Sequence, residues 1–301
     1  MSKETILVTA AAGKTGLSTV QQLRAQGHGV RALVHQDDAR AEALRKQGAK
    51  VIVGDLLDHD DVQRATAGID AAYFCYPIRP GLIQATSYFA EAAKNAGVKA
   101  IVNMSQISAR RDSQSHAARD HWIAERVFDW SGVAVTHLRP TFFAQWLTYP
   151  FQRASFDQGV IDLPYGTGRH APIAAEDQAR LIAAILTAPH DHAGKTYTLH
   201  GPVEMDEAGI AAAAGAALGR TIVYRPSTLE EYRRRLEANG LPEFLVQHLC
   251  AVAVDCQNGI FAGEDTIIAK TTGQAPMTVQ EFVALHRDSF QTRAAASVGA
   301  R

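Results

Sequence analysis

Short apolar runs alternate with helical segments along the first half of this chain, and this alternation restricts the fold more than any other feature. The runs are short enough to be strands and cover 5–9, 29–35, 49–54, 68–75, 98–105 and 133–138. Strands that alternate with helices form parallel sheets, joined by right-handed crossovers and covered by helices on both faces. The sequence therefore predicts an α/β protein with a doubly wound parallel Rossmann sheet.

The second half of the chain has a different pattern. Helical segments at 176–188, 205–218, 227–238, 241–257 and 278–290 are joined by short extended pieces. A chain of 301 residues, 47% of them apolar, can bury one large core and one smaller core. We expect a Rossmann domain over residues 1–150 and a smaller, mainly helical lobe over 151–301, parts of which can return to the sheet.

Composition excludes several classes of protein. Lys and Arg total 30 against 31 for Asp and Glu, which argues against a nucleic-acid-binding surface. Three cysteines cannot form a disulfide framework, and no signal peptide or membrane-spanning run is present, so we expect a cytoplasmic protein without membrane contact. His190 and His192 flank Asp191 in a loop that favours a solvated turn, and we expect no metal site.

The first apolar run leads into a turn of small residues with the spacing Ala10-x-x-Gly13-x-x-Gly16. Small residues let the backbone approach a pyrophosphate, and free N–H groups at a helix start attract it. The spacing alone is a weak signal, because similar turns precede many helices. A nucleoside triphosphatase loop is disfavoured, because Val8 occupies the position where its cradle requires glycine.

The carboxyl ends of parallel strands form the ligand crevice in such folds. In this chain those ends are 10–13, 35–36, 55–56, 76–77 and 104–105. Aromatic residues crowd the segment after the sixth run, at Phe142, Phe143, Trp146, Tyr149 and Phe151. They can pack between two lobes, line a substrate pocket, or do both.

These features together resemble the NmrA-like branch of the atypical short-chain dehydrogenases/reductases, which includes bacterial quinone and triphenylmethane dye reductases and a fungal regulator. The stretch Val-Thr-Ala-Ala-Ala-Gly-Lys-Thr-Gly at 8–16 carries part of the likeness. The other matching stretches are 30–34, 54–56, 93–98, 131–132, 138–140, 176–179 and 195–201. They cover nearly the whole chain, with Ala10 in place of the family's first turn glycine. Alanine fits this position if its backbone angle is not left-handed.

The resemblance implies a dinucleotide site at the strand ends. The implied cofactor-binding residues are Ala10, Gly13, Lys14, Thr15, Gly16, His35, Asp55, Leu56, Tyr76, Pro77, Met104, His121, Pro140, Thr141 and Phe142. It also favours NADP(H) over NAD(H).

One position complicates that preference. His35 stands where the family usually has an Arg for the 2′-phosphate, and the acids Asp37 and Asp38 nearby would oppose a phosphate. Lys14 or Arg31 can compensate.

The catalytic positions of the wider superfamily are only partly filled. Ser105 matches its serine, but Ala117 and His121 stand at the places of the Tyr-x-x-x-Lys pair. His121 and Glu125 are four residues apart, so either the carboxylate orients the imidazole or the two form a surface pair. The candidate catalytic residues are His121, Tyr76 and Ser105.

The sequence supports an NAD(P)H-binding oxidoreductase that transfers hydride to a quinone-like or aromatic small molecule. Its expected substrate contacts are Tyr76, Phe142, Trp146 and Tyr165. Because the Tyr-x-x-x-Lys pair is missing, two alternatives stay open: a regulator that senses NAD(P) without turnover, and a biosynthetic tailoring enzyme. The oligomeric state is not fixed, and a homodimer is one of the options.

Overall fold

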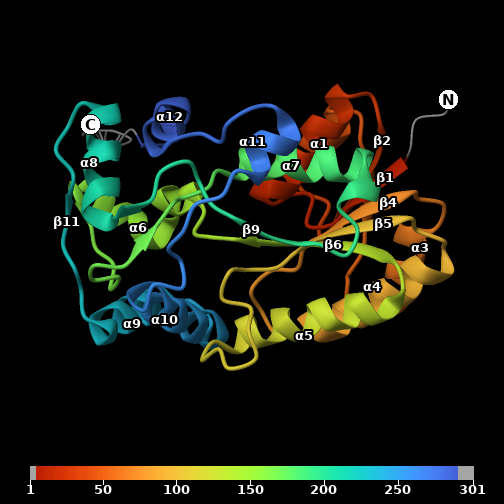
Figure 1. The fold of residues 1–301 in the computed structure, drawn as a ribbon, viewed down its shortest axis with the longest axis horizontal. Coiled ribbons are helices and arrows are strands. Elements are labelled where there is room, and N and C mark those ends of the chain that lie inside the picture. Colours follow the sequence, from red (N-terminus) through yellow and green to blue (C-terminus); the bar gives the residue numbers. More distant parts are fainter. Residues whose placement is uncertain (1–4, 291–301) are drawn as a thin grey trace, which may run out of the picture.

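A seven-stranded sheet forms the centre of the protein in the computed structural model, which describes residues 5–290 (Figure 1). The strands lie in the order β3-β2-β1-β4-β5-β6-β9, and all neighbours are parallel. Their bounds are β1 (Thr5–Val8), β2 (Gly29–Val34), β3 (Lys50–Val53), β4 (Ala71–Phe74), β5 (Ala100–Met104), β6 (Ala134–Pro140) and β9 (Thr196–Leu199). The predicted doubly wound fold is confirmed.

Helices cover both faces of this sheet (Figure 1). One face carries α1 (Lys14–Ala25), α7 (Ala175–Thr187) and α11 (Ile267–Thr272), and the other carries α3 (His59–Thr66), α4 (Leu82–Asn95) and α5 (His116–Ser131). The helix α2 (Ala39–Lys46) covers the same face as α1, because the two helices share one core cluster. Successive side chains of a strand point to opposite faces. Ile6 and Val8 therefore belong to the core on the α1 side of the sheet, while Leu7 belongs to the core on the α4 side. All three are fully buried. This double burial explains why the strands read as continuous apolar runs.

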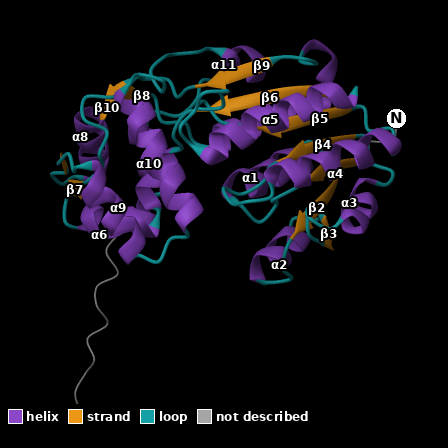
Figure 2. Ribbon diagram, turned by 90° about the horizontal axis from the view of Figure 1, so that it is seen from below, coloured by secondary structure: helices purple, strands orange, loops and turns teal. Residues whose placement is uncertain are grey.

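A second lobe lies beyond the carboxyl ends of the strands (Figure 2). Its helices are α6 (Pro150–Asp157), α8 (Glu207–Leu218), α9 (Leu229–Ala238), α10 (Glu243–Gln257), α12 (Val279–Leu285) and α13 (Arg287–Phe290). Two short strand pairs complete it, β7 (Val160–Ile161) with β11 (Val223–Tyr224) and β8 (Arg169–His170) with β10 (Met205–Asp206). Single 3₁₀ turns lie at Ala144–Thr148 and Pro189–Asp191.

The chain crosses between the two lobes more than once. After α6 and the strands that follow, α7 packs on α1 and β9 pairs with β6, so this part of the chain belongs to the sheet. The second lobe has its own core, which includes Phe156, Tyr232 and Phe282. Among residues 5–290, no helix has both the length and the hydropathy needed to cross a membrane.

The start of α1 is held very close to the end of β1. A Cβ atom built on Gly16 would lie 2.4 Å from the carbonyl oxygen of Ala10, so only glycine allows this approach. Ala10 has φ of 46°, in the left-handed region that disfavours residues with a side chain. The sequence interpretation accepted alanine here on condition that its backbone was not left-handed, and that condition is not met.

Two substitutions in this turn should shift stability in opposite directions. Gly16→Ala should lower the free energy of unfolding by about 1–3 kcal/mol, because the new methyl group overlaps a backbone oxygen. Ala10→Gly should raise it by up to about 1 kcal/mol, because relief of left-handed strain exceeds the entropy that glycine adds to the unfolded chain. Urea denaturation of both variants tests this, and a stabilised Gly16→Ala protein would contradict it.

Candidate functional site

Two adjoining cavities form one elongated cleft at the point where the strand order reverses, between β1 and β4. One cavity, of about 360 Å³, lies at the ends of β2 and β3, and we call it the β2–β3 cavity. The other, of about 420 Å³, lies at the ends of β5 and β6 and reaches the second lobe; we call it the β5–β6 cavity. Both are lined by Ala10, Gly13, Cys75, Tyr76 and Pro77. Open parallel sheets bind their ligands at such a reversal.

The residues expected to bind cofactor all line this cleft. His35, Asp55 and Leu56 line the β2–β3 cavity. The β5–β6 cavity is lined by Lys14, Thr15, Gly16, Met104, Ser105, His121, Pro140, Thr141, Phe142 and Trp146. Their roles as ligands stay predictions, but the structure brings them to one place.

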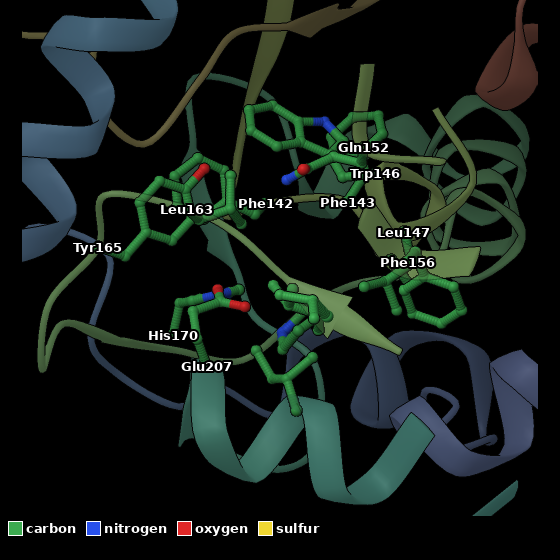
Figure 3. Close-up of a pocket in the computed structure, with 15 residues that line it drawn as sticks. Phe142, Phe143, Trp146, Leu147, Gln152, Phe156, Leu163, Tyr165, His170 and Glu207 are labelled. Atoms are coloured by element: carbon green, nitrogen blue, oxygen red, sulfur yellow. The ribbon is translucent and has the colours of Figure 1, made fainter. Parts of the chain in front are cut away.

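Tyr165 is the exception among the expected substrate contacts. It lines a separate cavity of about 30 Å³ inside the second lobe, together with His170 and Glu207 (Figure 3). Its ring is buried and stacks on Phe142, with 4.9 Å between the ring centroids. Phe142 also stacks on Phe261 at 3.9 Å, so it packs the lobes together and lines the cleft at once.

The amino end of α1 is built to receive an anion. No side chain caps it, whereas Asp38 caps α2 and Ser115 caps α5. The first N–H groups of a helix have no partner within the helix, and the positive end of its dipole favours negative charge. In the same cleft the buried Thr141 Oγ1 has no hydrogen-bond partner among the described residues. Both features fit a bound dinucleotide, with its pyrophosphate at α1.

The charges around the β2–β3 cavity are more balanced than the sequence suggested. Asp37 pairs with Arg45 at 2.8 Å. Asp38 accepts from the Nε of Arg40 at 2.9 Å, and hydrogen bonds from Arg40 lower the pKa of Asp38 to about 2. Each acid thus has its own arginine and opposes a phosphate less than expected. Arg40 itself lines the cavity and was missed from the sequence.

Arg31 is committed elsewhere. Its Nη1 donates to the carbonyl oxygens of Ala65 and Ala67, each at 2.7 Å. It is absent from the lining of the cleft, so the idea that it compensates for His35 is wrong. The imidazole of His35 is exposed, with its Nδ1 3.8 Å from a carboxylate oxygen of Asp55.

Tyr76 forms a wall of the cleft where the two cavities meet. Its hydroxyl donates to the carbonyl oxygen of Pro80 at 3.0 Å and accepts from Arg79 Nε at 3.1 Å. The guanidinium of Arg79 also lies 5.1 Å from the centre of the ring. Because the phenolic proton already has an acceptor, this arrangement favours an aromatic wall over a proton donor.

Glu125 does not pair with His121. It is fully buried and accepts from Ser105 Oγ at 2.6 Å. Arg139 binds both its oxygens, with Nε–Oε1 at 2.8 Å and Nη2–Oε2 at 2.5 Å. Both predictions for the His121–Glu125 pair, orientation of the imidazole and a surface contact, are therefore wrong. The proton of Ser105 faces this carboxylate, which favours a structural role for that hydroxyl.

Two buried histidines from different lobes approach each other in the β5–β6 cavity. Burial, together with the nearby His248, lowers the pKa of His121 to about 3, and burial lowers the pKa of His248 to about 4. Both rings are thus neutral at pH 7. Within residues 5–290 no group of three or more His, Cys, Asp or Glu could hold a metal ion.

The sequence analysis missed the contribution of α10 to the cleft. Leu245, His248, Leu249 and Val252 all line the β5–β6 cavity. Their spacing of three and four residues puts them on one side of a helix. A histidine within that apolar stripe was the signal that could have identified His248.

Comparison with known proteins identifies the family. A family model described as NAD(P)H-binding matches residues 10–189, more than half of the chain. This chain belongs to the NAD(P)H-binding family. An NAD(P)H azoreductase from Xenophilus azovorans is 31% identical over 287 residues, covering 95% of this chain and 99% of the relative. The predicted resemblance and the assignment as an NAD(P)H-binding oxidoreductase are confirmed.

Two solved reductase structures share the fold of this chain. The NADPH-dependent quinone oxidoreductase of Escherichia coli, complexed with NADPH, has a TM-score of 0.81 at 25% identity, over 94% of this chain and 99% of that one. The Citrobacter sp. triphenylmethane reductase complexed with NADP(H) has a TM-score of 0.81 at 24% identity, over 93% and 99% of the two chains. The second likeness concerns the fold alone.

The buried imidazole of His121 should make stability depend on pH. Its pKa is about 3 in the folded protein against an ordinary value near 6.5, so the unfolded chain binds the proton first and acid favours unfolding. Between pH 7 and pH 5 this group should remove about 2 kcal/mol of stability.

Denaturant unfolding of wild type and His121→Gln at both pH values measures the effect. The variant should lose about 2 kcal/mol less than wild type on going to pH 5. His190→Gln is the control, since the side chain of His190 is fully exposed. This variant should lose as much unfolding free energy as wild type between pH 7 and pH 5. Equal losses in wild type and His121→Gln would contradict the assignment.

Proposed function

We propose that this protein is an NADPH-dependent reductase of flat, conjugated small molecules of the quinone or azo class. The observation that carries the proposal is the composition of the β5–β6 cavity. Beside the amino end of α1 it has a wall of apolar and aromatic side chains: Phe142, Trp146, Tyr149, Leu245, Leu249, Val252 and Phe261. Such a wall suits a planar conjugated ring. The relatives named for azo and quinone reduction support the same acceptor class.

The residues divide the work between the two ends of the cleft. The nicotinamide cofactor, when bound, supplies a hydride. The amino end of α1 and Lys14 would hold its phosphates, and the unpartnered hydroxyl of Thr141 would be available to its nicotinamide end. Phe142 and Trp146 hold the acceptor ring and keep water from that face. A reduced quinone or azo group can take its proton from water, so the absent tyrosine is not required.

Acceptor-dependent oxidation of the cofactor tests this function. Purified protein is mixed with NADPH and then with a benzoquinone, a naphthoquinone and an azo dye, and absorbance at the reduced nicotinamide band is followed. We expect oxidation that saturates with at least one acceptor. Tight NADPH binding without oxidation by any acceptor would favour the cofactor-sensing regulator instead.

The preference for NADP(H) over NAD(H) rests on the mouth of the β2–β3 cavity. Arg40 and His35 both line it, and both are exposed. A guanidinium makes strong, charge-assisted hydrogen bonds to phosphate, and an imidazole adds a donor. Asp38 already holds Arg40 across the start of α2, which limits the entropy lost when a 2′-phosphate binds.

Substitution of these two residues should affect NADPH much more than NADH. Arg40→Ala should raise the Kd for NADPH about tenfold, or about 1.4 kcal/mol, and His35→Asp should cost over about 1 kcal/mol. NADH binding should change less than about threefold. Lys46→Ala removes an exposed charge from the same helix outside the cleft and serves as control. Fluorescence titration measures all four proteins, and equal losses for both nucleotides would contradict a phosphate contact.

A further inference from the structure

We propose that His248 of the second lobe donates its Nε2–H to the reducible group of the acceptor, and so selects acceptors that carry a lone pair there. Quinone oxygens and azo nitrogens have such a lone pair, whereas the central carbon of a triarylmethane cation does not. This inference rests on the proposed reductase function and refines its substrate class.

The ring of His248 reaches the cleft from α10. It is buried and lines the β5–β6 cavity close to His121 of α5. Its Nδ1 lies 2.8 Å from the hydroxyl oxygen of Ser115, which caps the start of α5. The imidazole therefore joins the two lobes on one edge and has its other edge at the cavity.

The hydrogen bonds of Ser115 determine which nitrogen of His248 carries the proton. Its Oγ accepts from the Ala118 N–H at 3.1 Å, as an N-cap must, and its own proton needs an acceptor. Since Ser115 is fully buried, His248 Nδ1 is that acceptor, and the neutral ring must then carry its proton on Nε2. None of the described residues accepts from Nε2, and this nitrogen is not sealed in the core. The donor is available to a molecule in the cleft.

Contacts on both sides hold this part of α10 in place. Gln247 donates to the Gln114 carbonyl at 2.7 Å and accepts from the His116 N–H at 3.1 Å. Two turns further along, Asp255 binds the two Nη groups of Arg110 at 2.8 and 2.6 Å. The Nε2–H is thus a preorganised donor, whose hydrogen bond costs little ordering entropy when the acceptor binds.

The charges of the cavity point to the same acceptor class. Among the described lining residues Lys14 carries the only fixed charge, and no Asp or Glu is present. Burial lowers the pKa of His248 to about 4, so the ring is a neutral donor. A cationic dye would find no carboxylate here, while a neutral acceptor gains a hydrogen bond that withdraws electron density from the group receiving the hydride.

A matched pair of variants isolates the Nε2–H. His248→Asn keeps a polar atom near the position of Nδ1, for Ser115, and removes the donor at Nε2. His248→Gln places an amide N–H near the position of Nε2. We expect kcat/KM for a benzoquinone and an azo dye to fall at least tenfold in His248→Asn and to recover to within about threefold of wild type in His248→Gln. Turnover of a triarylmethane cation should change less than about threefold in either.

The readouts separate this proposal from the function it rests on. The NADPH Kd and the Tm of each variant, compared with wild type, show whether the cleft is intact. If none of the acceptors causes the wild type to oxidise NADPH, the reductase function fails. Benzoquinone binding to the NADP⁺-loaded wild type and His248→Asn proteins then tests the contact. Equal loss of all acceptor classes in His248→Asn, unchanged quinone turnover, or unchanged quinone binding in that arm would overturn the proposal.

Discussion

The contact between the backbone of Gly16 and the carbonyl of Ala10 fixes the geometry on which the cleft depends. It sets the start of α1 directly against the end of β1, at the strand where the order of the sheet reverses. Because β1 lies between β2 and β4, its end borders both halves of the cleft, and the two cavities meet there. The left-handed backbone of Ala10 is the strain that this arrangement tolerates.

A buried carboxylate engages the serine that matches the catalytic serine of the wider superfamily. Glu125 accepts from Ser105 and is held by Arg139 of β6. Removing one partner of a buried ion pair typically costs about 3–5 kcal/mol, because the other charge is left uncompensated. This network therefore stabilises the junction of α5 and β6. The polar groups that line the cavity include the neutral imidazoles of His121 and His248, one from each lobe.

The sequence predicted the parts of the site that follow from strand order, and missed the parts that depend on distant contacts. Apolar runs buried on both faces predicted the sheet. The expected cofactor contacts came from the strand ends, as with His35 and Asp55, or from the family resemblance, as with Thr141, and all of them line the cleft. Pairing was not predictable from spacing. Glu125 stands four residues from His121 but binds Arg139 on β6, because a buried carboxylate needs a charged partner and the imidazole is neutral.

The contribution of the second lobe to the cleft escaped the sequence argument for a related reason. His248 meets Ser115 across 133 residues of chain, and no local pattern indicates which helix will cover the strand ends. The covering is nonetheless firm, since Phe142 leaves β6 and stacks between Phe261 and Tyr165. A cofactor site fixed by the sheet can thus be combined with an acceptor site fixed by α10. Changes in the stripe formed by Leu245, His248, Leu249 and Val252 can then alter the acceptor without disturbing the turn at Gly16.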